Sequence, residues 1–466
     1  MLFNSFEFLL FFIIVLILYY RLPKNTVMPM MILASCVFYC FFIPAYLIIL
    51  FVVILVDYFS GIGIDKYPSY KKVLLIVSIC SNLGILFVFK YYNFFISTSN
   101  ELLGTQWVLL HIILPIGLSF HTFQSMSYVI EVYHGRYSVE KNIGYFSLYV
   151  LYFPQLVAGP IECPQNLLPQ FKKERHFSWD NILDGIRLIL WGLFKKAVIA
   201  DRISFYVNGI FKDATQYETT QVALGVFFFT IQIYCDFSGY SDMAVGISKC
   251  FGIDLMFNFN RPLLASNLKE LWARWHISLY LWFKKYIYIP LGGNKKGRFV
   301  MGLNILLVFF ISGLWHGAGY NYIVWGILNG VFILLYLILN PYLPSLQHPL
   351  LKILSVMLTF TTVALIFVFF RSENLLQAKA VFTQLLHPTS KWIFSGSFDQ
   401  FAFGNMNLIF IITMILGMFI IERKVSPSLS YFTHKSWVDI VFCIGLILLI
   451  FFTGIFTKQH FIYFQF

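Results

Sequence analysis

Two tryptophan–histidine steps, Trp275-His276 and Trp315-His316, lie forty positions apart in this chain. The second step falls within an apolar run typical of a membrane span. Burying an imidazole there is costly, so a histidine in such a run indicates a functional site. A neutral imidazole can also take a proton near neutral pH. The sequence therefore makes His316 a functional-site candidate; the alternative is a core histidine hydrogen-bonded to a neighbouring helix.

Five polar islands interrupt the apolar chain with hydrogen-bonding side chains, most of them beside Gly or Pro. They cover 117–124, 155–162, 236–242, 274–278 and 312–317. Irregular backbone at membrane depth normally lines a water-filled cavity or a site buried in protein. Each island is therefore a place where chemistry could occur.

The islands carry a family resemblance that extends over essentially the whole chain. The stretches concerned are 115–123 (PIGLSFHTF), 155–161 (QLVAGPI), 236–244 (DFSGYSDMA), 274–278 (RWHIS), 283–294 (FKKYIYIPLGGN), 314–317 (LWHG) and 461–466 (FIYFQF). In this order they resemble the membrane-bound O-acyltransferase superfamily, most closely its bacterial alginate and peptidoglycan O-acetyltransferase-like branch.

The resemblance implies an all-α polytopic membrane protein, with about 11–13 transmembrane, re-entrant and interfacial helices around a central tunnel. It also implies acyl transfer from a thioester donor, across the membrane, to a hydroxyl acceptor. His316 matches the essential histidine of the family and His276 matches the second signature position. His276 could equally organise packing at the membrane interface. His121 stands where the family pattern often has Tyr, and no catalytic role is assigned to it.

Further polar residues of the islands are candidates for supporting roles: Asp236, Ser238, Asp242, Arg274, Trp315 and Asn294. The two aspartates each accompany a glycine-containing break, so they either orient His276 or a basic cluster, or cap a broken helix. Asn and Ser side chains, or amides of broken helices, are candidates for holding the developing oxyanion. No metal is expected, because the seven Cys show no Cys-x-x-Cys spacing.

The donor is expected at a basic, tryptophan-rich stretch, 254–298, which reads as amphipathic and interfacial. Lys284, Lys285 and Arg298 are its predicted donor-side surface. Acetyl-CoA, or an acyl carrier thioester, would be a substrate there, with no bound cofactor. The alternative is a solvated loop that only satisfies the positive-inside rule.

The expected function is transfer of an acetyl group from a cytoplasmic thioester toward hydroxyls of an extracytoplasmic polysaccharide, either an exopolysaccharide or peptidoglycan. The chain itself is expected to be a multi-pass protein of the bacterial cytoplasmic (inner) membrane, with a separate extracytoplasmic acetyltransferase or esterase-like protein as its partner. One alternative is transfer of D-alanine or another acyl group from a phosphopantetheinyl carrier. The other is a non-enzymatic polysaccharide transporter, which the absence of two repeated halves disfavours.

The elements that must position these residues are membrane helices. With 59% hydrophobic and 12% charged residues, the chain reads as polytopic. Its net charge of +12 fits lysine and arginine retained in cytoplasmic loops and gives no reason to invoke nucleic acid. Apolar runs predict spans near 6–20, 26–43, 45–63, 73–89, 106–132, 143–158, 182–211, 219–235, 299–315, 322–340, 349–370, 406–421 and 436–456.

Charged loops suggest how these spans are arranged. The N-terminus is expected outside, without a cleaved signal peptide. Span 106–132 should kink or break at Pro115 and Gly117, and 143–158 should be a re-entrant or broken element, because basic residues flank it on both sides. Tilt of the span 299–315, or a break at Gly302 or Gly313, would bring His316 toward mid-membrane. The longest outside loop is expected at 372–405, and 1–466 is expected to be one domain, with a catalytic core at 115–320 followed by C-terminal membrane helices at 321–466.

Overall fold

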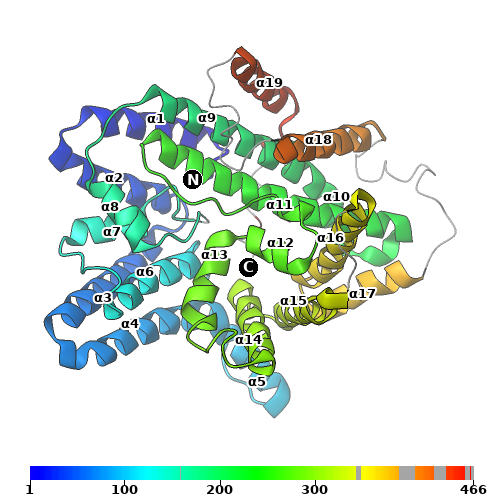
Figure 1. The fold of residues 1–466 in the computed structure, drawn as a ribbon, viewed down its shortest axis with the longest axis horizontal. Helices are drawn as coiled ribbons and strands as arrows, with labels where there is room; N and C mark the ends of the chain where they lie inside the picture. Colours follow the sequence, from blue (N-terminus) through cyan, green and yellow to red (C-terminus); the bar gives the residue numbers. More distant parts are fainter. Residues whose placement is uncertain (158, 343–347, 388–404, 425–436, 457–461, 463–466) are drawn as a thin grey trace. The chain divides into compact units, whose positions relative to one another are not determined.

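The structure is a computed structural model that describes residues 1–466 except 158, 343–347, 388–404, 425–436, 457–461 and 463–466. The described residues form helices joined by irregular segments, and no strand occurs among them (Figure 1). Seven of the described helical runs are long and apolar enough to cross a membrane: Pro44–Lys66, Pro68–Leu103, Thr219–Cys250, Arg298–His316, Tyr320–Tyr342, Pro349–Arg371 and Met406–Arg423. The chain is therefore an all-α, multi-pass membrane protein, as its composition predicts.

The helices group into two compact units, each built from two separate segments of the chain. The first unit comprises Met1–Ile189 and Tyr240–Met256, and the second comprises Leu190–Gly239 and Phe257–Phe466. The first contains α1 (Phe6–Arg21), α2 (Lys24–Cys40), α3 (Leu47–Lys66), α4 (Lys71–Leu86), α5 (Tyr92–Leu103), α6 (Leu118–Tyr133), α7 (Ile143–Leu151), α8 (Pro164–Lys172) and most of α9 (Trp179–Leu193).

In the first unit α3, α4 and α6 pack against one another around a polar contact. The buried carboxylate of Asp57 on α3 accepts hydrogen bonds from the Ser78 hydroxyl (2.6 Å) and the Asn82 amide (2.9 Å) on α4. Donors from a second helix satisfy the oxygens of this buried side chain, so it joins two apolar helices at a defined register.

Two predicted spans of the first unit differ from the structure. The run 106–132 is not one span, because its helix begins only at Leu118, after Gly117 in the left-handed region (φ 76°). The break predicted near Pro115 is thereby confirmed. Within 143–158, α7 ends at Leu151 and the next helix begins at Pro164, with no helix among the described residues between them, so the predicted broken element is also confirmed. Its sidedness stays a prediction.

The second unit contains the C-terminal end of α9, a π-helical stretch at Phe194–Ala200, and then α10 (Asp201–Lys212), α11 (Thr219–Cys250, to Gly239 in this unit), α12 (Leu268–Arg274), α13 (Ile277–Phe283), α14 (Arg298–His316), α15 (Tyr320–Leu339), α16 (Pro349–Arg371), α17 (Leu375–Leu386), α18 (Asn405–Lys424) and α19 (Trp437–Thr453). Helix α17 lies inside the predicted outside loop 372–405 and is not one of the seven membrane-length helical runs, so the position of this loop outside the membrane stays a prediction. Residues 388–404 of the same prediction lie outside the described residues.

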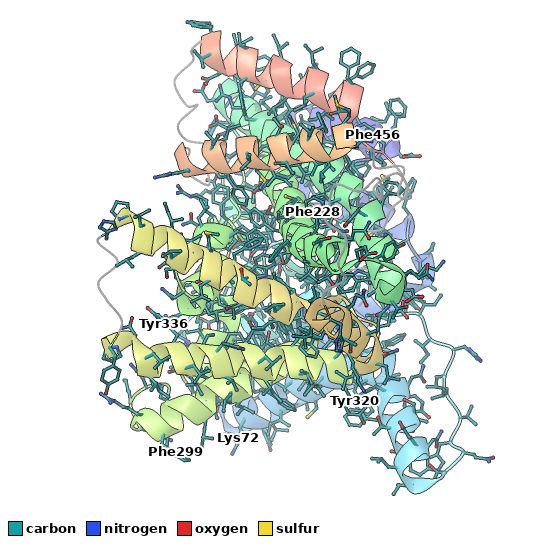
Figure 2. The ribbon with its side chains drawn as sticks, turned by 90° about the vertical axis from the view of Figure 1, so that its right-hand side faces the viewer. Lys72, Phe228, Phe299, Tyr320, Tyr336 and Phe456 are labelled. Atoms are coloured by element: carbon teal, nitrogen blue, oxygen red, sulfur yellow. The ribbon has the colours of Figure 1, made fainter. Side chains whose placement is uncertain are left out.

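Helices α14 and α15 form an antiparallel hairpin. Figure 2 shows Phe299, near the start of α14, at the same end as Tyr336, near the end of α15, with Tyr320 at the opposite end. The helices approach closely at Gly313, where an added Cβ would overlap the carbonyl oxygen of Tyr322. Helix α14 is continuous from Arg298 to His316, so the break considered at Gly302 or Gly313 is wrong.

Helix α11 is likewise unbroken where a break was expected. It runs from Thr219 to Cys250 through the island 236–242, so Asp236 and Asp242 do not cap a broken helix. The glycine of this island, Gly239, is instead required by close packing, because a Cβ there would lie 2.7 Å from the carbonyl oxygen of Gly192. Gly239 therefore permits a close helix–helix approach, which an isolated sequence does not distinguish from a break.

Candidate functional site

The second unit contains a cavity of about 780 Å³ that both signature histidines line. One wall is a single face of α14, formed by Met301, Ile305, Val308, Phe309, Ser312 and His316. From Met301 to His316 this wall rises about 22 Å at 1.5 Å per residue. The cavity is thus long enough to hold an extended molecule.

His316 closes one end of the cavity and is held by aromatic rings. It is the last residue of α14 and is buried. Its imidazole meets the rings of Trp325 on α15 and Phe370 on α16 edge to face, with centroids 5.0 and 5.3 Å apart. These contacts restrict the ring and exclude water from its flanks.

His276 lies between α12 and α13 with a left-handed backbone (φ 43°, ψ 55°). Its buried ring packs edge to face on Phe237 of α11 at 4.8 Å, and Trp315 stands 6.1 Å from it. Trp315 also contacts the neighbouring His316 at 4.8 Å. Burial lowers the pKa of His276 to about 3, because the charged imidazolium would lose its hydration. His276 is therefore neutral at physiological pH.

Further aromatic residues form the wall between the two histidines. The indole N–H of Trp272 donates to the side-chain oxygen of Asn329 (3.1 Å), and its ring lies 5.5 Å from that of Trp325. Trp275 packs on Phe259 at 5.2 Å and on Phe367 at 5.6 Å. Trp272 and Trp275 of the basic stretch are thus buried residues of the site, and the interfacial position of the stretch stays a prediction.

The other end of the cavity is polar and basic. It is lined by Lys269, Lys284, Gly292, Gly293, Asn294, Lys295 and Lys296. The Asn304 amide on α14 donates to the carbonyl of Gly293 (3.1 Å) and so attaches this loop to the helix. Of the predicted donor-side residues, Lys284 lines the cavity, whereas Lys285 and Arg298 do not.

Asp236 belongs to a buried ionic cluster away from the cavity lining. Its carboxylate meets the Lys196 ammonium at 2.6 Å, and Lys196 also reaches Asp201 at 2.8 Å. The backbone N–H of Ile462 donates to the second Asp236 oxygen (2.8 Å). Asp236 thus orients a basic residue, one of the two roles considered. Its sequence neighbour Phe237, not Asp236, contacts His276.

The remaining predicted residues have different settings. Arg274 is paired with Glu270, and Asn294 is exposed at the basic end. The Ser238 hydroxyl is buried and has no hydrogen-bond partner within the described part of the chain. Asp242 belongs to the first unit, so it is not placed with the histidines.

Sequence reasoning missed Trp325, Phe370 and Lys196. The first two are single aromatics in aromatic-rich spans and carry no distinguishing signal. Lys196 had one: with Lys195 it interrupts an apolar run, and a buried cation within such a run normally has a carboxylate partner.

The arrangement is suited to acyl transfer. A neutral imidazole in a mostly apolar, protein-enclosed space can accept a hydroxyl proton, and a basic entrance attracts an anionic ligand. No group of three or more His, Cys, Asp or Glu with metal-binding geometry occurs among the residues that the structure describes.

Comparison with known proteins agrees with this chemistry. A model of the MBOAT, membrane-bound O-acyltransferase family, matches residues 138–350. The chain is 36% identical over 388 residues to a peptidoglycan O-acetyltransferase of Helicobacter pylori, covering 77% of this chain and 74% of that protein. It is 37% identical over 385 residues to a probable alginate O-acetylase of Pseudomonas aeruginosa (80% and 73%). A teichoic acid D-alanyltransferase of Bacillus subtilis is 27% identical over 234 residues (47% and 58%).

Proposed function

The chain belongs to the membrane-bound O-acyltransferase family and is an O-acetyltransferase, and we propose that it moves acetyl from a cytoplasmic thioester to hydroxyls of an extracytoplasmic polysaccharide. Peptidoglycan or an alginate-like exopolysaccharide is the proposed acceptor, because these are what the similar proteins are named for. Family membership excludes the alternative of a non-enzymatic transporter.

One observation carries the proposal: His276 and His316 line the same cavity as Lys284, Lys295 and Lys296. A thioester arm built from two amide units, as in coenzyme A, extends about 17 Å by standard bond lengths. The cavity wall of about 22 Å is long enough to accept it. The anionic end of the donor would stay among the lysines while the acyl carbonyl approaches His316.

In the proposed reaction His316 is the general base. Its neutral imidazole takes the proton of the acceptor hydroxyl as the oxygen attacks the thioester carbonyl. The tetrahedral intermediate then collapses with loss of the thiolate, which takes the proton back from the imidazolium. Hydrogen-bond donors must hold the developing oxyanion. Neutral His276 lines the same cavity and can offer its ring N–H for this role.

The proposed catalytic core at 115–320 contains both histidines, and α15 and α16 add the rings that hold His316. We place the protein in the cytoplasmic membrane of a bacterium, where the donor is made on one side and the polymer lies on the other. An extracytoplasmic esterase-like partner is proposed to complete delivery to the polymer.

The test compares His316→Gln and His316→Ala with His121→Gln in permeabilised cells that contain the proposed partner, given labelled acetyl-CoA and polysaccharide. His121 is a buried histidine of the first unit, so its variant controls for loss of any buried imidazole. We expect the His316 variants to lose transfer by at least about a hundredfold while keeping the thermal stability of the wild type. Activity that survives in both His316 variants would refute the assignment.

A second candidate donor follows from the similarity to teichoic acid D-alanyltransferases: an acyl group carried on a phosphopantetheinyl protein. Such a donor would present the same arm to the same cavity. Incubation with acetyl-CoA and with D-alanyl carrier protein in parallel separates the two. Ester-linked acetate on the native polymer, measured with and without the gene, identifies the product in the cell.

A further inference from the structure

The backbone of His276 is strained. His276 and Arg261 are the non-glycine residues with positive φ within the described part of the chain. In this region the Cβ atom crowds the following carbonyl, so most residues avoid it. Such a conformation persists only where the surrounding structure holds it, and it occurs preferentially at functional sites.

The segment 258–260 holds this turn from both sides. Before His276, the Asn260 N–H donates to the carbonyl of Arg274 (2.9 Å). After it, the Ile277 N–H donates to the Asn258 carbonyl (2.9 Å). The Ser278 N–H donates to the side-chain oxygen of Asn258 (3.2 Å). Asn258 therefore accepts both bonds that follow His276, one through its backbone and one through its side chain.

We propose that Asn258 is a positioning residue that keeps the His276 imidazole directed into the cavity, an inference that rests on the proposed role of His276 in acyl transfer. Asn258 is buried, at 1% exposure, and is not among the residues that line the cavity. It therefore acts through His276. Without the side-chain bond the turn can relax toward the right-handed region, which reorients the Cα–Cβ bond and moves the ring.

The chain offers matched variants for this test. Asn258→Ala removes the acceptor for Ser278. Asn258→Asp keeps an oxygen acceptor, and since the Asn258 amide nitrogen has no hydrogen-bond partner among the described residues, this exchange breaks no bond. Asn260→Ala is the control, because its side chain accepts only from Arg261 (3.3 Å) in the described structure, while its backbone bond to Arg274 remains.

We expect Asn258→Ala to lower kcat about tenfold with the KM for donor unchanged, as expected when a strained residue loses one of the bonds that hold it. Asn258→Asp should restore most of the activity, and Asn260→Ala should resemble the wild type. If Asn258 acts through His276, adding Asn258→Ala to His276→Ala should cause no further loss. Should Asn258→Ala fold poorly, Asn258→Asp and Asn258→Ser supply the comparison.

A second readout does not depend on activity. The rate at which diethylpyrocarbonate modifies His276, measured by mass spectrometry, should rise in Asn258→Ala and stay at the wild-type value in Asn260→Ala. Unchanged reactivity, or multiplicative losses in the double variant, would overturn the positioning role. Absence of transfer by the wild-type protein would instead overturn the proposed function, and the His276 modification rate would still decide the positioning role.

Discussion

The basic end of the cavity permits a charge-matched test of where the donor binds. Lys284 and Lys285 are sequence neighbours, yet only Lys284 lines the cavity; Lys295 lines it and nearby Arg298 does not. Two double variants, Lys284→Gln/Lys295→Gln and Lys285→Gln/Arg298→Gln, therefore remove the same net charge from the same part of the chain. They differ in whether the lost cations face the cavity.

The expected change in the KM for acetyl-CoA follows from the exposure of the two lysines. Lys284 and Lys295 are exposed, and an exposed ion pair contributes about 0.2–1 kcal/mol, so a contribution of about 0.7 kcal/mol is assigned to each. Two of them amount to about 1.4 kcal/mol, which is about tenfold in affinity. The cavity-facing double variant should thus raise the KM for acetyl-CoA about tenfold. The other variant should change it less than about twofold, since charges farther from the donor are screened by salt.

Initial rates measured against acetyl-CoA concentration at saturating acceptor report this difference. KM reflects binding only if chemistry is slower than donor dissociation, which single-turnover rates would check. Raising the ionic strength should shrink the gap between the two variants. Equal KM values for both double variants, or a change confined to the acceptor KM, would refute the placement of the donor among these lysines.

Three further outcomes are expected. Cysteines introduced near Lys141 and near Glu162 should both react with an impermeant thiol reagent only from the cytoplasm if 143–158 is re-entrant, and labelling near 162 from outside would contradict this topology. Burial raises the pKa of Glu162 from 4.5 to about 7 although Asn166 and the Met256 N–H donate to it. The folded protein therefore favours the protonated form of Glu162, and its stability should fall as the pH rises from about 4.5 to 7. Glu162→Gln should flatten this dependence of the melting temperature on pH. An unchanged dependence would rule out Glu162 as its source. Gly313→Ala should lower the free energy of unfolding by about 1–3 kcal/mol, because the added Cβ overpacks against Tyr322. Gly302→Ala is the control, since its added Cβ meets only the flexible side chain of Leu334. In detergent, Gly313→Ala should therefore have the lower melting temperature, and equal melting temperatures would argue against the close contact.

The sequence alone determined the class of this protein and predicted the two histidines that line its cavity. Long apolar runs must form membrane helices, because a backbone in lipid has no other way to satisfy its polar groups. A histidine in such a run carries an energetic cost that singles it out, and this identified His316 without coordinates. His276 was predicted from the order of the family-like motifs along the chain.

Tertiary structure decided which of the other polar residues share the site. Asp236 and His276 both lie in polar islands, but Asp236 pairs with Lys196 while His276 lines the cavity. Of the neighbouring residues Lys284 and Lys285, only Lys284 lines the cavity. On a helix, adjacent residues point in directions about 100° apart, so which of them faces a cavity depends on where other helices pack. The left-handed turn at His276 also depends on tertiary structure, because its strain is offset by hydrogen bonds to Asn258, eighteen positions earlier in the chain.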